Sequence, residues 1–446
     1  MNLVEKKLEN ATVELEITVP EDTIEIEYKS VFNKIRSSAK LNGFRKGKAP
    51  IDLIERKYHE YADKEVLENI AKSSYLDAIK EKELEPINIP EFDIDKNIVR
   101  GEPFKFKVKI ELAPTVELGE YKGLSIEELP CKVVEEDINN EIDSLRKNNA
   151  NYLKKDTDKP VTDGDYIKLK IKRIDNIEVN ERDNVEFTEI PFTVGERTNE
   201  FSFDKHVLGM KENEEKEIEI KYPKDFQEQK IAGQNIKYLI KVSEINVIEL
   251  PELDDEFAKD IGEFSSLEDL RENIQEDIQK FVDSKSKSRT QGELIKQIIE
   301  KSKFDIPPSM VKSEMQAIFD RIQQRVGLQG VDIEKYTSMM KIDKDEFDKK
   351  LNEEALSNIK TTLSLTEIAK KEELKFSEEK YNKTIEGIAQ KSNKSIEEIE
   401  EYASQSGMRE NIELELLLDK ALNLVYDNAT IKKLKPVLMN DFLKEN

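Results

Sequence analysis

The sequence predicts a multidomain α+β protein, with an α+β domain first, a β-rich domain in the middle and an elongated, all-helical C-terminal part. Three patterns support this prediction. The N-terminal stretch mixes apolar residues at period two with apolar residues at helical spacing, the middle shows short alternating strands between turns, and the remainder shows helical spacing alone. A chain of 446 residues is long enough for about three domains.

The composition favours helices with thin cores over one compact globule. Hydrophobic residues make up 37 % of the chain and charged residues 38 %, and there is no Trp. So little apolar material suits elongated helices, and the sustained periodicity argues against disorder. The 72 Lys and Arg residues against 96 Asp and Glu residues give a formal net charge of −24. A chain this acidic repels non-specific contacts with nucleic acids.

Several classes of protein are not expected. The N-terminus lacks an apolar signal-peptide core and no run of 18 apolar residues occurs, so we expect a cytoplasmic protein without a membrane partner. Cys131 is the only cysteine, which fits a reducing compartment. His59 and His206 have no companion ligands nearby in the sequence, so no metal is expected. No phosphate-binding Gly-x-x-x-x-Gly-Lys loop occurs, and we expect no cofactor.

The N-terminal domain is predicted over residues 1–115. Residues 11–18 alternate apolar and polar side chains as a half-buried strand does, and residues 104–112 form the clearest strand pattern of the chain. Helical spacing between these strands predicts helices at residues 21–35, from Pro50 onward, and at about 62–80.

A basic loop precedes the second of these helices. It reads Gly43, Phe44, Arg45, Lys46, Gly47, Lys48, Ala49, Pro50. The glycines suit a tight turn, and proline suits the first turn of a helix. Residues 34–57 contain eight cations and only two acids, Asp52 and Glu55. An ordinary basic surface loop is the alternative, but such an island on an acidic chain favours docking on a polyanion, where the aromatic ring fills an apolar pocket or stacks on a base.

The rest of the chain divides into three further parts. Residues 116–154 are predicted to be a linker with a connecting helix at 135–148. Residues 155–248 are predicted to be the β-rich domain, and residues 249–446 the helical part. The expected strands are 166–174, 217–222 and 236–242, and the expected helices are one from Leu267 onward and those at 308–327, 345–373, 377–392, 395–404 and 408–434.

The basic loop resembles the Gly-Phe-Arg-x-Gly-x-x-Pro ribosome-docking signature of the bacterial trigger factor family, ribosome-associated chaperones with a prolyl-isomerase domain. The order of the parts downstream extends the resemblance over all 446 residues. It implies an ATP-independent chaperone that holds nascent or unfolded polypeptides open and assists folding and export. It also implies homodimers away from the ribosome. The implied contacts with the large subunit near the exit tunnel, to protein and rRNA, are Gly43, Phe44, Arg45, Lys46, Gly47, Lys48 and Pro50.

The β-rich domain resembles FKBP-type prolyl isomerases in its turns at residues 209–216, 222–226 and 232–233. Prolyl isomerisation needs no acid or base, because an apolar aromatic pocket lowers the barrier of about 20 kcal/mol by favouring the twisted amide. The residues placed in such a pocket are Phe201, Phe203, Phe226 and Ile240.

This sequence departs from the FKBP pattern at two places. The usual Ile-Pro-Gly-Phe-Glu wall is replaced by residues 200–204, Glu-Phe-Ser-Phe-Asp, and the usual Phe-Asp/Glu pair by Val179 and Asn180. A weak isomerase and a degenerate binding domain therefore stand as equal interpretations.

Binding of unfolded clients is assigned to the helical part by the resemblance. Met adapts to varied partners, but apolar residues at helical spacing are more often packing than contacts. The candidates are Met310, Met315, Ile318, Phe319 and Ile322. Two alternatives remain open: a protein that is mainly a free prolyl isomerase with substrate-recruiting helices, and a non-catalytic helical scaffold.

Overall fold

The computed structural model describes residues 1–42, 44–94, 97–175, 186–195, 203–223, 231–327 and 330–444. The chain forms two compact units. The first contains Met1–Glu128 and Lys287–Lys433, and the second contains Leu129–Ser286 and Leu434–Asn446. Both units are discontinuous in sequence, because the chain leaves the first after Glu128 and returns to it at Lys287. The four-part division into residues 1–115, 116–154, 155–248 and 249–446 stays a prediction.

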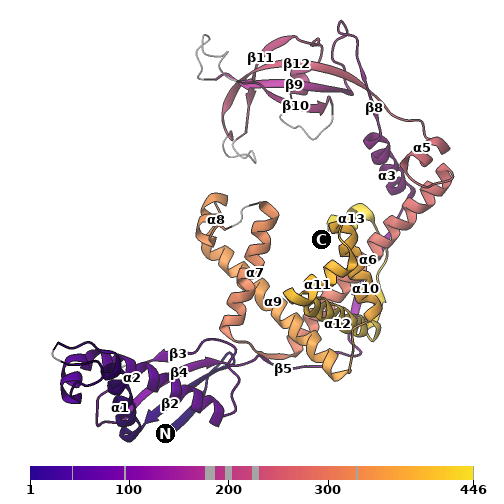
Figure 1. Ribbon diagram of the computed structural model, residues 1–446. Helices are drawn as coiled ribbons and strands as arrows, with labels where there is room; N and C mark the ends of the chain where they lie inside the picture. Colours follow the sequence, from indigo (N-terminus) through magenta and orange to yellow (C-terminus); the bar gives the residue numbers. More distant parts are fainter. Residues whose placement is uncertain are drawn as a thin grey trace. The chain divides into compact units, whose positions relative to one another are not determined.

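The first unit begins with a four-stranded antiparallel sheet that shares its core with two helices (Figure 1). The strands lie in the order β1-β2-β4-β3. Every second residue of β2 and β4 is buried, as the alternating patterns predict. The elements are β1 (Asn2–Lys7), β2 (Thr12–Val19), α1 (Glu21–Ser38), α2 (Ile51–Glu81), β3 (Glu91–Asp93) and β4 (Phe104–Glu111). The predicted α+β class of this part is confirmed.

Two helices were expected here, and the structure has two helical segments that join at a kink within α2. Tyr58 alone departs from helical geometry, with φ −122° and ψ 19°, and marks a kink between a first segment and a longer second one. The first helix, α1, buries Ile24, Tyr28, Val31, Phe32 and Ile35 and continues to Ser38, slightly beyond its predicted end.

The helical part of the first unit is held by several small cores, as the apolar-poor composition predicts. One core lies among α7, α8 and α9, and another among α10, α11 and α12. Side chains of Asp332, Asp343, Ser377 and Ser395 cap the N-termini of α8 to α11. The helices are α6 (Leu267–Lys301), which belongs to this unit only from Lys287 onward, α7 (Pro308–Val326), α8 (Ile333–Met340), α9 (Lys344–Lys371), α10 (Glu378–Ser392), α11 (Ile396–Ser406) and α12 (Met408–Asp427).

The segment expected to be a linker is divided between the two units: residues 116–128 are packed into the first, and residues 129–154 belong to the second. The strand β5 (Thr115–Glu117) pairs with β13 (Lys303–Asp305), and β6 (Ser125–Glu128) pairs in parallel with β14 (Thr430–Lys433). Leu124 is buried among residues of α6, α9 and α12. The helix expected at 408–434 therefore ends early, because the residues after Asp427 pair with a strand from the first third of the chain.

The second unit contains the β-rich domain. Its sheet has the order β10-β9-β12-β11, with β8 also paired to β12. All three predicted strands are present, and the last continues to Glu249. The elements are β7 (Cys131–Lys132), α3 (Glu135–Asn148), β8 (Asn151–Lys154), β9 (Asp165–Arg173), β10 (Thr188–Thr193), α4 (Asp204–Val207), β11 (Glu215–Lys221), β12 (Asn235–Glu249), α5 (Asp255–Ile261), β15 (Val437–Leu438) and α13 (Met439–Lys444).

Within the described ranges, no helix combines the length and apolar character that crossing a membrane requires. The same residues contain no group of three or more His, Cys, Asp or Glu side chains arranged to hold a metal ion.

Candidate functional site

The basic loop connects α1 to α2 and presents its tip to solvent. Phe44 is 42 % exposed, whereas Ala49, five residues later, is only 7 % exposed and packs into the core of the sheet domain. The amide of Lys48 donates to the carbonyl of Arg45 at 2.9 Å, which closes a turn. Gly47 has φ +78°, a conformation that favours glycine. The loop is thus anchored at Ala49 and turned outward at Phe44. Gly43 lies outside the described residues.

The cations around this loop lack carboxylate partners. Among the described residues none of the eight has a carboxylate oxygen within 4 Å; they are Lys34, Arg36, Lys40, Arg45, Lys46, Lys48, Arg56 and Lys57. By contrast, Arg100 binds both Glu25 and Glu55, and Lys105 binds Glu16. The positive potential of the loop region is therefore not neutralised locally, which suits an anionic partner.

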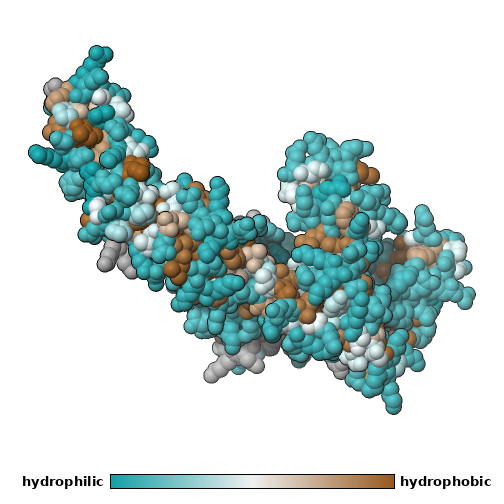
Figure 2. All heavy atoms as spheres, turned by 90° about the horizontal axis from the view of Figure 1, so that it is seen from below, coloured by the Kyte–Doolittle hydropathy of each residue, from teal (hydrophilic) through white to brown (hydrophobic). Residues whose placement is uncertain are grey.

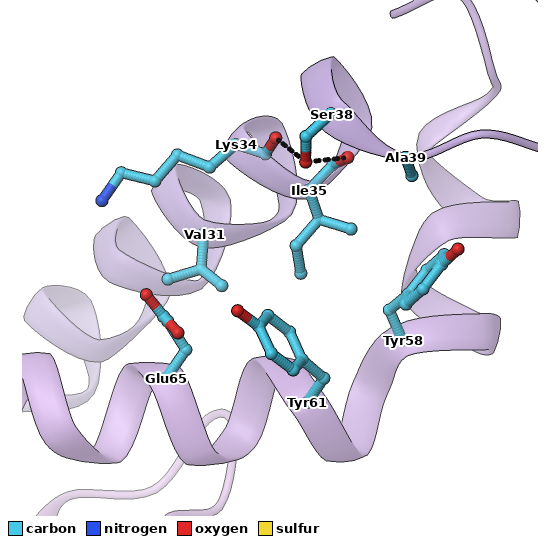
Figure 3. A pocket seen from close by; sticks show the side chains of 8 residues that line it. All are labelled: Val31, Lys34, Ile35, Ser38, Ala39, Tyr58, Tyr61 and Glu65. Atoms are coloured by element: carbon cyan, nitrogen blue, oxygen red, sulfur yellow. Dashed lines mark hydrogen bonds between the residues drawn. The ribbon is translucent and has the colours of Figure 1, made fainter. Parts of the chain in front are cut away.

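A pocket of about 280 Å³ lies between α1 and α2 (Figure 3). Val31 and Ile35 point from α1 toward the ring of Tyr61 on α2. The Ser38 hydroxyl donates to the carbonyls of Lys34 and Ile35. A hydrogen bond to Glu65 raises the pKa of Tyr61. The lining mixes the apolar Val31, Ile35 and Ala39 with polar and charged side chains, among them Lys34 and Glu65.

The second candidate site is an aromatic cluster in the β-rich domain. The ring of Phe203 meets that of Tyr238 edge-on, with centroids 5.6 Å apart, and the hydroxyls of Tyr238 and Tyr222 are 3.3 Å apart. Both tyrosines and Phe203 are half-buried against a core that contains Ile240, which is fully buried. Burial raises the pKa of Tyr238, so this hydroxyl stays protonated at neutral pH.

Sequence analysis did not single out the two tyrosines. Tyr238 stands two residues before Ile240 on β12, so the alternation of the strand places both side chains on one face. This spacing is the sequence signal that could have identified Tyr238. Of the other predicted pocket residues, Phe201 and Phe226 lie outside the described residues, as do Val179, Asn180 and Glu200.

The predicted client-binding residues of α7 divide into two groups. Ile318 and Phe319 are 3 % and 1 % exposed, and the ring of Phe319 packs edge-on against Tyr336. These two side chains are core residues of the helical arm formed by α7, α8 and α9, and they are almost fully covered there. Met310, Met315 and Ile322 are half-buried and keep part of their surface exposed.

Other apolar side chains of this arm are more exposed. Val326, Met339, Met340 and Ile342 are 41–53 % exposed. On the face seen in Figure 2, apolar residues form separate patches among hydrophilic ones. Such patches suit several weak contacts.

The chain is similar to known proteins in sequence and in fold. Residues 1–145 match the family model described as bacterial trigger factor protein (TF), and residues 266–427 match that of its C-terminus. Trigger factor of Caldicellulosiruptor bescii is 32 % identical over 432 residues, which cover 96 % of each chain, and that of Halothermothrix orenii is 29 % identical over 96 % of this chain and 99 % of its own.

A solved structure is similar in fold. It comes from work on promiscuous substrate recognition in folding and assembly activities of the trigger factor chaperone, and it covers 96 % of this chain and 99 % of its own with a TM-score of 0.54 and 20 % identity. At this identity the likeness concerns the fold alone.

Proposed function

This chain belongs to the trigger factor family of ribosome-associated chaperones, and we propose that it docks on the large ribosomal subunit through the loop at residues 44–50. The observation that carries the proposal is an exposed aromatic ring, Phe44, set among cations that have no carboxylate partner in the described chain. Arg45 and Lys46 supply charge and hydrogen bonds to phosphates or carboxylates, and Phe44 supplies the apolar contact.

The rest of the molecule makes this contact selective. With a formal net charge of −24, most of the surface repels RNA, so the basic loop is favoured over other orientations. The contacts include protein and rRNA near the exit tunnel, where emerging chains are within reach of the apolar patches on the helical arm. Because no ATP-binding loop occurs in the sequence, clients are released by weak, exchanging contacts and not by ATP hydrolysis. The protein acts in the cytoplasm and forms homodimers away from the ribosome.

Co-sedimentation with ribosomes tests the docking loop. The test variant combines Phe44→Ala, Arg45→Ala and Lys46→Ala. The control combines Leu76→Ala, Lys64→Ala and Lys72→Ala, which removes the same kinds of exposed side chain from the second segment of α2. We expect the loop variant to lose binding and the control to keep it, with unchanged circular dichroism in both. Equal binding by the two variants would contradict the proposal.

We further propose that the β-rich domain is a weak prolyl isomerase. The contact between Phe203 and Tyr238 supports this, because aromatic faces receive a proline ring and exclude water from the twisting amide. Refolding of a model protein limited by proline isomerisation measures the activity. If refolding in the presence of the protein is no faster than the uncatalysed refolding, the proposal of isomerase activity fails and the domain acts in binding alone.

A further inference from the structure

The start of the short helix α4 carries Phe203, one ring of the aromatic pair in the β-rich domain. The carbonyl of Phe203 accepts from the amides of His206 and Val207 at 2.9 Å each, so the backbone of this residue belongs to the first turn of α4. Val207 is fully buried in the core of the domain. Packing therefore fixes the C-terminal side of α4, and the direction of the Phe203 ring depends on what holds the N-terminal side.

A hydrogen bond to another element holds that N-terminal side. The amide of Gly195, two residues beyond the end of β10, donates to Oδ1 of Asp204 at 3.1 Å. The neighbouring Val194 is buried in the domain core, so the end of β10 is a fixed support. The Asp204 carboxylate thereby joins this support to the residue next to Phe203, across the segment 196–202, which lies outside the described residues.

The backbone at Gly195 is shaped for this contact. Its φ is +89°, and a Cβ added there would collide with the carboxylate of Asp163. The turn that contains Asp163 is itself tied to the same place, because the amide of Gly164 donates to the carbonyl of Val194 at 2.9 Å. The two carboxylates approach Gly195 differently: Asp163 lies where a Cβ would stand, and Asp204 accepts from the amide.

We propose that Asp204 is a positioning residue for the isomerase reaction, which holds the first turn of α4 against the end of β10 so that the Phe203 ring stays edge-on to Tyr238. This inference rests on the isomerase activity proposed above and names a residue that keeps the aromatic pair in place. In this role Asp204 exchanges no proton. It acts through the ring alone, since the aromatic face has to be in place before the amide twists.

Proline-limited refolding of a model protein in the presence of the full-length chain tests this role. Asp204→Ala should lower the catalysed rate constant about threefold, the factor expected of one partly exposed hydrogen bond. Asp204→Asn keeps an oxygen that accepts from the Gly195 amide and should keep most of the activity. Glu214→Ala is the matched control: it removes a carboxylate that accepts from the amide of Lys211 in the turn before β11, and it should leave the rate unchanged.

A double variant separates positioning from a purely structural role. In Phe203→Ala the ring is absent, so the further change Asp204→Ala should lower the rate no more. A structural defect would instead add its own loss to that of Phe203→Ala. Hydrogen exchange of the amides of residues 206–208 should be faster in Asp204→Ala than in the unaltered protein and unchanged in Asp204→Asn.

The outcomes distinguish this role from the isomerase activity itself. Equal rates for Asp204→Ala and the unaltered protein, or a further loss in the double variant, would overturn the positioning role and leave the isomerase proposal intact. Absence of catalysis by the unaltered protein would refute the isomerase proposal, and the positioning role with it. If Asp204→Ala does not fold, Asp204→Ser replaces it with the same expectation, because serine suits the start of a helix but its side chain is one bond shorter.

Discussion

The hydroxyl of Tyr28 donates a 2.8 Å hydrogen bond to the carboxylate of Asp63 and so joins the middle of α1 to α2. Burial, followed by this bond, raises the pKa of Tyr28. The bond lies in the second segment of α2, beyond the kink at Tyr58, and it sets the spacing of the two helices that carry the basic loop.

Tyr28→Phe should loosen this helical pair without unfolding it. The lost hydrogen bond costs about 1 kcal/mol of local stability, because Asp63 is partly exposed and regains water. Hydrogen exchange of the α1 amides in the full-length chain measures the effect as faster local opening. Unchanged exchange would show that packing alone holds the helices together.

Gly47→Ala should weaken ribosome binding while leaving the fold intact. The φ of +78° costs a residue with a Cβ roughly 1–2 kcal/mol, so the loop leaves its outward turn and affinity falls about fivefold to thirtyfold. Gly101→Ala is the matched control, since Gly101 has φ +83° and open space around it in the same domain but outside the loop. Similar losses in both variants would point to general destabilisation.

Ribosome binding should depend on salt in proportion to the cations engaged. Each lysine or arginine that neutralises a phosphate adds about one unit to the slope of log affinity against log salt. Lys46→Ala should therefore lower the magnitude of that slope by about one, and Lys64→Ala should leave it unchanged. A slope near zero for the unaltered protein would mean that the loop binds ribosomal protein without phosphate contacts.

Phe203→Ala should lower the isomerase rate constant roughly threefold to tenfold, because it removes one ring of the aromatic pair. Tyr238→Phe keeps the ring and should retain most of the activity. Since no acid or base takes part, the catalysed rate should be flat between pH 6 and pH 8, as the raised pKa of Tyr238 keeps its hydroxyl protonated. A bell-shaped profile would indicate a different mechanism.

Acid should selectively weaken the β-rich domain through His206. Burial, assisted by Lys216 and Lys205, lowers the pKa of this imidazole in the folded state. The unfolded chain therefore binds the proton more readily, and stability is lost as the pH falls below the ordinary histidine value of about 6.5. Thermal unfolding at pH 7.5 and 5.5 should show a smaller acid shift in His206→Gln than in the unaltered protein.

Patterns that are local in sequence were predictable. The strand at Phe104–Glu111 alternates apolar and polar residues regularly. The helices expected from residues 377 and 395 begin at Glu378 and Ile396, each directly after a capping serine. The basic loop was recognisable because its glycines, cations and Phe44 are adjacent in the chain. Its contribution to ribosome binding remains a proposal, which the exposure of Phe44 and the cations without carboxylate partners support.

Features that depend on distant partners were not predictable. The pairing of Ser125–Glu128 with Thr430–Lys433 follows from tertiary packing, and helical spacing alone extended the last helix too far. The same limit applies to Ile318 and Phe319, since spacing shows that a helix face is apolar but not whether α8 and α9 cover it. Tyr222 and Tyr238 meet only when β11 and β12 pair.

The parallel pairing of β6 with β14 also determines when this protein can complete its own folding. A ribosome releases the chain from the N-terminus onward, so the sheet of residues 2–111 can assemble early from neighbouring segments. Leu124 and β6 must wait until nearly the whole message has been translated, because their partners include Ala421, Val425 and residues 430–433. A newly made copy therefore emerges with the backbone edge of β6 unpaired and with Leu124 uncovered until the last residues of the first unit have been made.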